Sequence, residues 1–340
     1  MTDANLFEQQ AANRRRSAWL TAAFVLFTAW VGFGGDLAWY LFTRDAPRTE
    51  YHHIVPFIGL AGMAIAAGIA WFSWRFGAKQ VLAAAGAVEV TEPTTPEQRI
   101  LVNVVEEMAI ASGLPKPRVW IVPDSDPNAF ATGTDPAGAH LAVTRGLLAT
   151  LNRDELQGVV AHEMAHVRNF DIRLMTLLAG MVGAIVLLSD VMRNFLRFGG
   201  PRPTSKSNSR KGNPLAVIVL LVWLVTLIIA PIVARLLAMA VSRKREFLAD
   251  ATGAELTRNP GALAAALEKL DQAVAPTQSI ARGAAHMCIV DPAGRQLTSD
   301  AGPFARFASH PPIAERMARL RAMAYGGSRA EGQRGGVSAA

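Results

Sequence analysis

The stretch His162-Glu163-Met164-Ala165-His166 decides the architecture that this chain must adopt. Two histidines four residues apart on an α-helix lie one turn apart on the same face, so both imidazoles can reach a single metal ion. The adjacent glutamate completes a pattern typical of zinc peptidases, in which two ring nitrogens hold Zn²⁺ and the carboxylate takes a proton from the attacking water. A chance match is the alternative, and it is disfavoured because only 7 of the 340 residues are histidines.

The residues around this motif predict a helix with one face in the protein core. Asn152 can cap its first turn, and Glu155 follows at the position of a capping box. Apolar residues then recur at helical spacing, at Leu156, Val159, Val160 and Met164. We expect the helix to run past His166 and Asp171 and straight into the apolar residues 174–188.

Composition places the chain among membrane proteins. Hydrophobic residues make up 51% of it, yet its formal net charge is +7, so apolar and basic segments must be separated along the chain. The basic residues form no stripe interleaved with aromatic side chains, which argues against a nucleic-acid partner. The single cysteine, Cys288, excludes an intramolecular disulfide and fits a catalytic part in a reducing compartment.

Two apolar runs precede the histidine motif. They cover residues 17–42 and 54–76, and each is long enough to cross a hydrocarbon layer of about 30 Å. The basic N-terminus, residues 1–16, ends in three arginines. By the positive-inside rule, the N-terminus and the chain after residue 76 therefore lie in the cytoplasm.

Two further runs follow the motif. Residues 174–189 are a marginal span, about 23 Å long if the run is helical, whereas residues 215–241 are long enough to cross and contain Pro231 as a kink. The basic flexible loop 193–213 lies between them. If both runs cross, this loop lies outside, against the positive-inside rule, so a re-entrant hairpin stays open beside the crossing hairpin that we favour.

The remaining residues, 88–173 and 242–325, form the expected cytoplasmic zinc-peptidase domain, and a disordered tail is expected over 326–340. Spacing and turn residues predict a helix over 97–112 and strands over 118–122, 128–131 and 140–144.

A small sheet before a zinc helix can hold an extended peptide along its edge strand through backbone hydrogen bonds. Asn128, Ala129 and Phe130 are therefore candidate substrate-binding residues. Plain scaffold strands are the alternative.

A catalytic zinc needs three protein ligands and a fourth position for water. Glu246 and Asp250 follow the last apolar run and share one helix face, so Glu246 can bind the metal while Asp250 accepts a hydrogen bond from a ligand histidine. A solvated helix face is the alternative for this pair. The nearby histidine motif favours the metal interpretation.

At this point the chain resembles the HtpX-type membrane zinc endopeptidases, relatives of the CAAX prenyl endopeptidases. The resemblance covers nearly the whole chain and departs in the loop 193–213 and the Gly-rich tail. It rests on the histidine motif paired with Glu246-Phe247-Leu248-Ala249-Asp250, on residues 128–133, on Asp171 five residues past the second histidine, and on Ser309-His310-Pro311-Pro312 followed by Glu315-Arg316.

The resemblance implies a gluzincin fold with one Zn²⁺ per chain on His162, His166 and Glu246, and with Glu163 as the base. Asp171 then joins Asp250 as a partner of the ligands. The implied role is cleavage of misfolded or damaged membrane proteins at the cytoplasmic face of a bacterial inner membrane.

The segment after residue 309 offers candidates for stabilising the oxyanion that forms at the scissile carbonyl. The three tyrosines lie in no motif, so His310 and Arg316 are the better candidates. The alternative is a loop before a helix over 313–323, with Arg316 as a surface charge. The resemblance favours function and adds the option that His310 occupies the zinc in a resting state.

The expected fold is thus a mainly α polytopic membrane protein with an α+β zinc-peptidase domain, acting on protein substrates beside membrane lipid. A CAAX prenyl-type endopeptidase is one alternative, although such enzymes more often carry extra spans. A catalytically silent adaptor or metal-handling membrane protein is the other. An adaptor would be expected to have lost Glu163 or a ligand, and a transporter to cluster ligands inside its spans.

Overall fold

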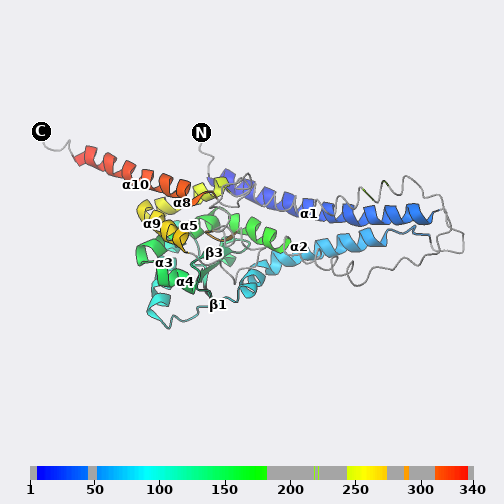
Figure 1. The fold of residues 1–340 in the computed structure, drawn as a ribbon, viewed down its shortest axis with the longest axis horizontal. Helices are drawn as coiled ribbons and strands as arrows, with labels where there is room; N and C mark the ends of the chain where they lie inside the picture. Colours follow the sequence, from blue (N-terminus) through cyan, green and yellow to red (C-terminus); the bar gives the residue numbers. More distant parts are fainter. Residues whose placement is uncertain are drawn as a thin grey trace. The chain divides into compact units, whose positions relative to one another are not determined.

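The computed structural model of this chain comprises two compact units (Figure 1). One unit contains residues 1–15, 76–179 and 237–340, and the other contains residues 16–75 and 180–236. The structure describes residues 6–44, 52–181, 218, 221, 243–273, 287–290 and 311–335.

The described chain has two helices that are long and apolar enough to cross a membrane. They are α1 (Leu6–Thr43) and α2 (Phe57–Ala84), and they contain most of the two apolar runs predicted before the histidine motif. Both extend beyond those runs. α1 begins within the polar N-terminal segment, and α2 continues past residue 76 to Ala84.

In the second unit, α1 and α2 approach closely at two glycines and are joined by a buried carboxylate. A Cβ atom on Gly32 would lie 2.7 Å from the Cα of Gly59, so only glycine allows this approach. Asp36 accepts hydrogen bonds from the backbone N–H of Ile58 at 3.1 Å and of Gly59, and it meets the His53 ring at 2.5 Å. Asp36 thereby satisfies backbone donors at the start of α2.

The first unit contains a four-stranded sheet in the order β1-β2-β4-β3. Strands β2 and β4 are parallel, and the other two pairs are antiparallel. The strands are β1 (Val88–Glu89), β2 (Arg118–Val122), β3 (Ala129–Thr132) and β4 (His140–Thr144). The three longer strands confirm the sequence prediction within one residue, whereas the two-residue β1 was not predicted. The order leaves β3 at one edge of the sheet.

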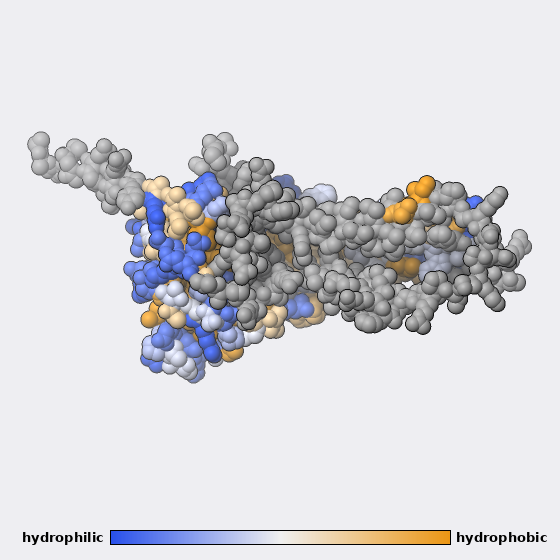
Figure 2. All heavy atoms as spheres, in the orientation of Figure 1, coloured by the Kyte–Doolittle hydropathy of each residue, from blue (hydrophilic) through white to orange (hydrophobic). Residues whose placement is uncertain are grey.

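Besides the ends of α1 and α2, the 3-10 turn Pro136–Gly138 and the helical residues from 171 onward, the described part of this unit contains six helices. α5 is the central one, and its Val159, Val160 and Met164 are fully buried among residues of the sheet, α3 and α9. Hydrophilic residues form much of the visible surface of the unit in Figure 2. The helices are α3 (Pro96–Ser112), α4 (Arg145–Thr150), α5 (Arg153–Arg168), α8 (Arg243–Thr257), α9 (Pro260–Gln272) and α10 (Ile313–Gly335).

The prediction that the histidine helix continues straight into the third apolar run is wrong. α5 ends at Arg168, and Phe170 has a positive φ of 59°, a left-handed conformation that breaks the helix. Helical structure resumes at residue 171 and is described to residue 181.

Several predictions concern the chain ends and the later apolar runs. Residues 182–189 of the third run, all of the loop 193–213, and all of residues 215–241 except 218 and 221 lie outside the described residues. α10 begins where the sequence predicts a helix, but it runs to Gly335, into the tail expected to be disordered.

Candidate metal centre

The start of α5 sets the position of the histidine motif. The Asn152 side chain accepts a hydrogen bond from the Glu155 backbone N–H at 2.9 Å, and the Glu155 carboxylate accepts one from the Asn152 N–H at 2.8 Å. This is the predicted capping box. Lys269 of α9 lies 2.7 Å from the same carboxylate and ties α9 to this end of α5.

A second helix, α8, packs closely against α5 at the first histidine. A Cβ atom on Gly253 would lie 3.1 Å from the backbone nitrogen of His162, which is tighter than an ordinary contact. The small residue therefore lets α8 approach α5, and Glu246 lies two turns before it on α8. This packing brings Glu246 to the two histidines across 80 residues of sequence.

The side chains of His162, His166 and Glu246 form the group in the described chain whose ligand atoms all lie within 4.8 Å of one another. The two Nε2 atoms are 3.3 Å apart, and each lies 3.6 Å from an oxygen of Glu246. Ligand atoms about 2.0–2.1 Å from a tetrahedral zinc ion lie about 3.3–3.4 Å from one another. All three residues are buried, so the donor set and its spacing fit a zinc ion.

Each histidine has a carboxylate on its other ring nitrogen. Asp250 lies 3.0 Å from His162 Nδ1, and Asp171 lies 3.1 Å from His166 Nδ1. A carboxylate at Nδ1 selects the tautomer that leaves Nε2 free to bind a metal. The turn at Phe170 is what brings Asp171 back to His166.

Arg316 of α10 is fully buried behind this group. Its Nε and Nη2 donate to the two oxygens of Asp250 at 2.8 and 2.7 Å, and its Nη1 donates to the Ile289 carbonyl at 3.0 Å. The Nη1 atom also lies 3.7 Å from Glu246. The alternative interpretation of Arg316 as a surface charge is therefore wrong.

Charges around the site favour a divalent cation. Burial disfavours a charged His162, but Asp250 and Glu246 outweigh it and raise the pKa of this imidazole to about 9. Burial also opposes ionisation of Asp250, but Arg316 lowers its pKa to about 2. Buried carboxyl groups also outnumber buried guanidinium groups here, with Glu163, Asp171, Glu246 and Asp250 beside Arg245 and Arg316.

Glu163 is buried beside the histidines, and neither of its carboxylate oxygens makes a hydrogen bond within the described part of the chain. Burial raises the pKa of this carboxyl, against the opposing effect of His162 and His166. A buried carboxylate without a protein partner is costly unless water or an ion meets it. The arrangement can therefore accept a proton from a water molecule held at the site.

The outer edge of β3 runs past this carboxylate and is partly covered by the chain itself. The Ile289 N–H donates to the Ala129 carbonyl at 3.0 Å, and buried Cys288 pairs with Phe130. The Asn128 side chain donates to the Val290 carbonyl at 3.0 Å. The candidate substrate-binding residues Asn128, Ala129 and Phe130 thus contact residues 287–290, a pairing that the sequence did not predict.

Ala131 is the next residue of β3 whose backbone faces the same edge. The Asn128 carbonyl accepts from Thr144 of β4, whereas the Ala129 carbonyl faces away from β4. Because backbone groups alternate in direction along an antiparallel strand, those of Ala131 face the same side as those of Ala129. Glu163 lies on this side, where the Ala131 N–H is near enough to oppose the rise of its pKa although the contact falls short of hydrogen-bond geometry.

The first unit thus brings together all but one of the predicted site residues. His310 lies outside the described residues. Asn13, Arg245 and Ile289 join the group without having been predicted. Arg245 stands next to Glu246 and could have been considered for that reason, whereas Asn13 and Ile289 carry no local signal.

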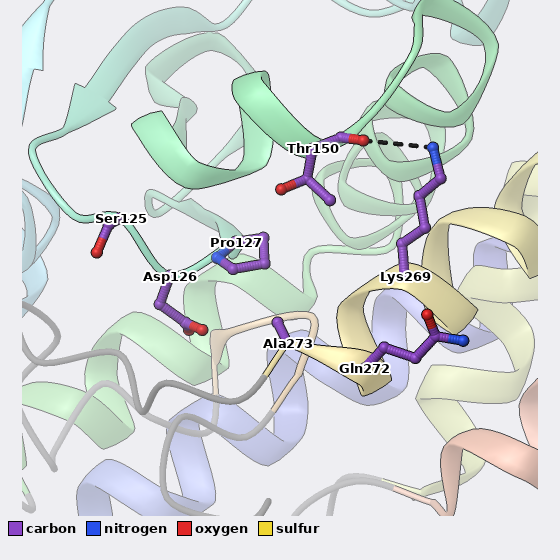
Figure 3. A pocket seen from close by; sticks show the side chains of 7 residues that line it. All are labelled: Ser125, Asp126, Pro127, Thr150, Lys269, Gln272 and Ala273. Carbon is purple, nitrogen blue, oxygen red and sulfur yellow. Dashed lines mark hydrogen bonds between the residues drawn. The ribbon is translucent and has the colours of Figure 1, made fainter.

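A separate surface pocket lies between the loop before β3 and α9 (Figure 3). Lys269 crosses beside it and donates to the Thr150 carbonyl at 3.3 Å. None of the predicted site residues lines this pocket. Its lining residues are Ser125, Asp126, Pro127, Thr150, Lys269, Gln272 and Ala273.

Comparisons with known proteins show the family of this chain. Residues 96–324 match the model of peptidase family M48. The chain is 41% identical over 329 residues to a protease HtpX homolog of Caldanaerobacter subterraneus subsp. tengcongensis, covering 95% of this chain and 99% of that protein. A protease HtpX homolog of Streptococcus gordonii is 38% identical over 318 residues, covering 94% of this chain and 100% of that protein.

Among solved structures, the crystal structure of S. mikatae Ste24p aligns with a TM-score of 0.45 and 18% sequence identity, over 89% of this chain and 66% of that chain. The family match spans most of the chain, and the two HtpX relatives align along nearly their whole lengths. The chain therefore belongs to peptidase family M48, as a membrane-associated metalloprotease of the HtpX type.

Proposed function

We propose that this chain is a zinc endopeptidase that cleaves misfolded or damaged membrane proteins, with a multi-pass anchor in a bacterial inner membrane and a catalytic domain facing the cytoplasm. The carrying observation is the buried group of His162, His166 and Glu246 beside Glu163, whose carboxylate makes no hydrogen bond in the described chain. Metal ligands and an available base are the two parts that this chemistry requires.

One zinc ion per chain would be held by the Nε2 atoms of His162 and His166 and by the carboxylate of Glu246. When bound, Zn²⁺ supplies a Lewis acid that polarises the scissile carbonyl and makes water more acidic. The tautomers that Asp250 and Asp171 impose keep both Nε2 atoms available for this ion.

Glu163 is the proposed general base. It takes a proton from the water molecule whose oxygen forms the new bond to the scissile carbon, and then gives that proton to the amide nitrogen as the C–N bond breaks. The products are a carboxylate and an amine. Burial favours both roles because a raised pKa makes this carboxyl a better base and allows it to hold the proton between the two steps.

The substrate is proposed to lie extended along the β3 edge, with Ala131 supplying its backbone N–H and C=O. Residues 287–290 already pair with Ala129 and Phe130, so a peptide either continues the line of this segment or displaces it. Backbone pairing accepts any sequence in an unfolded segment. This tolerance suits the cleavage of damaged proteins.

Arg316 and His310 are assigned different roles. Arg316 is proposed to be a positioning residue, because three of its nitrogens already donate to Asp250 and to the Ile289 carbonyl. The stabilisation of the oxyanion is then proposed for His310. This division keeps Asp250 and His162 fixed while a different side chain meets the substrate.

The membrane location of substrates is supported by sequence distances. Glu246 lies five residues beyond the predicted apolar run that ends at residue 241, and His166 lies eight residues before the run that begins at residue 174. At about 1.5 Å per helical residue, Glu246 is about 8 Å along the chain from the end of its run. Segments that emerge from a membrane would therefore meet the site.

The test is cleavage by the full-length chain purified in detergent. We expect it to cut a single-span membrane protein with an unfolded cytoplasmic segment, and not a farnesylated peptide that ends in a CAAX sequence. Removal of the metal with a chelator should abolish cleavage, and one equivalent of Zn²⁺ should restore it, because the ligand set leaves one metal position per chain.

Gel analysis of the products and metal counting by mass spectrometry provide the readouts. Preferential cleavage of the farnesylated peptide would favour the CAAX-type alternative. The zinc mechanism requires one ion per chain. Full activity of a sample that contains less than about 0.1 equivalent of metal per chain would therefore contradict it.

A substitution at Ala131 tests the β3 edge. Ala131→Pro removes the N–H that faces this edge, and proline is tolerated at edge strands. The loss of one hydrogen bond to substrate, worth about 1.4 kcal/mol, should raise KM about 10-fold without changing the zinc content, whereas an effect through Glu163, which the same N–H approaches, would change kcat. Ala131→Ser keeps the N–H and is the matched control, and equal kinetics in the two variants would contradict binding along this edge.

A further inference from the structure

A buried asparagine near the N-terminus contacts the metal centre from a distant part of the sequence. Asn13 lies on α1 before the apolar residues, belongs to the first compact unit, and is 5% exposed. Its Nδ2 donates to Asp171 Oδ1 at 2.8 Å and to the Asn169 carbonyl at 2.9 Å. It therefore uses both protons of one amide group on the turn that follows α5.

Asp171 links this amide to a proposed metal ligand. Its Oδ2 lies 3.1 Å from His166 Nδ1, whereas its Oδ1 accepts from Asn13 and from Arg245 Nη1 at 3.2 Å. A carboxylate with one oxygen held by two donors has a fixed plane, so its other oxygen points in a defined direction. Asn13 and Arg245 thereby determine where Asp171 meets His166.

The N-terminal segment also holds the turn that carries Asp171. The Asn169 carbonyl lies at the C-terminal end of α5, where carbonyls lack helical partners, and Asn13 donates to it. The Arg14 guanidinium lies 4.5 Å from the centre of the Phe170 ring. Phe170 has the left-handed backbone conformation that breaks the helix. Asn13 and Arg14, two adjacent residues of α1, therefore both contact this turn.

We propose that Asn13 is a positioning residue of the metal centre. It acts through Asp171 by fixing the orientation of the carboxylate that selects the tautomer of His166 and aims Nε2 at the metal. The polar start of α1, which precedes its apolar residues, is thus a part of the catalytic centre as well as a membrane-flanking sequence. This inference rests on the proposed zinc site.

The test compares Asn13→Ala and Asn13→Asp with Arg15→Gln, an exposed position two residues along the same helix. Loss of a hydrogen-bonding partner in the outer sphere of a metal typically weakens metal binding by about 10- to 100-fold. Because Asn13 acts through Asp171, which Arg245 still contacts, we expect Asn13→Ala to weaken zinc binding by about 10-fold, the lower end of that range, measured by competition with a chromogenic chelator in detergent. Asn13→Asp should weaken it further because its carboxylate repels Asp171, and Arg15→Gln should bind zinc like the wild type.

The absorption spectrum of the Co²⁺-substituted protein provides a second readout, because its d–d bands report ligand geometry. These bands should shift in Asn13→Ala and remain unchanged in Arg15→Gln. Melting of the metal-free proteins separates positioning from general stability, since a purely structural role would lower the melting temperature and leave the affinity and bands of the folded protein unchanged.

Wild-type zinc affinity and an unchanged Co²⁺ spectrum in both Asn13 variants would overturn the inference. Glu246→Gln distinguishes this failure from failure of the proposed site. If Glu246→Gln binds zinc as tightly as the wild type, the metal centre itself is misassigned. If Glu246→Gln loses zinc and the Asn13 variants do not, only the role of Asn13 is refuted.

Discussion

Replacement of Glu163 by glutamine is expected to lower kcat/KM by about 10³-fold or more while the protein still binds one zinc ion, in keeping with the upper part of the range for general acid–base catalysis. Glutamine has the same shape but cannot take a proton from water. The zinc site should survive because His162, His166 and Glu246 remain. Stability should not fall, since the Glu163 carboxylate makes no hydrogen bond in the described chain and burial disfavours its charge.

Single-turnover cleavage and metal counting on the same sample measure the effect. Glu255→Gln is the matched control, because it removes an exposed carboxylate from α8 and should leave kcat/KM unchanged. A Glu163→Gln variant that binds zinc and cleaves within 10-fold of the wild type would exclude Glu163 as the base, since that loss is below the about 10²-fold minimum for this role.

The central helix of the site could be predicted because its signals are local. The capping residues Asn152 and Glu155 stand three positions apart, and the two histidines stand four apart, so one helical periodicity relates all of them. Other local signals, spacing and turn residues, located the strands of the sheet. Glu246 needed a further argument, because its own surroundings are also compatible with a solvated helix face.

The contacts that could not be predicted join segments far apart in sequence. Asn13 and Asp171 are separated by 158 positions, and Asn128 and Val290 by 162. An asparagine in a polar N-terminal segment has no periodicity or motif that indicates a partner. The break after α5 was missed for a related reason, because Phe170 is not a residue type that favours the left-handed conformation.

The sequence indicated that Arg316 belongs to the site but did not indicate which role it has there. An arginine in the first turns of a helix is compatible with a surface charge, an oxyanion donor or a buried partner of an acid. Only the packing of α10 against α9 and the proximity of Asp250 distinguish these options. The geometry supports a buried partner of an acid. Replacement of Arg316 is therefore the most informative test of stability.

Replacement of Arg316 by methionine is expected to destabilise the first unit by about 3–5 kcal/mol, the range for removing one partner of a buried ion pair. Methionine preserves much of the volume but leaves Asp250 buried without its guanidinium partner, and it removes a donor from the Ile289 carbonyl. Chemical denaturation of the metal-free wild type and variant measures the change. Arg321→Met, which removes an exposed charge from the same helix, should change stability by less than about 1 kcal/mol.

The double variant Arg316→Met/Asp250→Asn separates the cost of an unpaired charge from the loss of packing. If the unpaired Asp250 carboxylate causes the destabilisation, the double variant should be more stable than Arg316→Met alone, because neither buried charge remains. Its zinc affinity should stay below that of the wild type, since asparagine is a weaker acceptor for His162 Nδ1. A double variant less stable than either single variant would show that Arg316 acts through packing on α10, and a loss of kcat without any change in stability or zinc affinity would return it to the role of oxyanion donor.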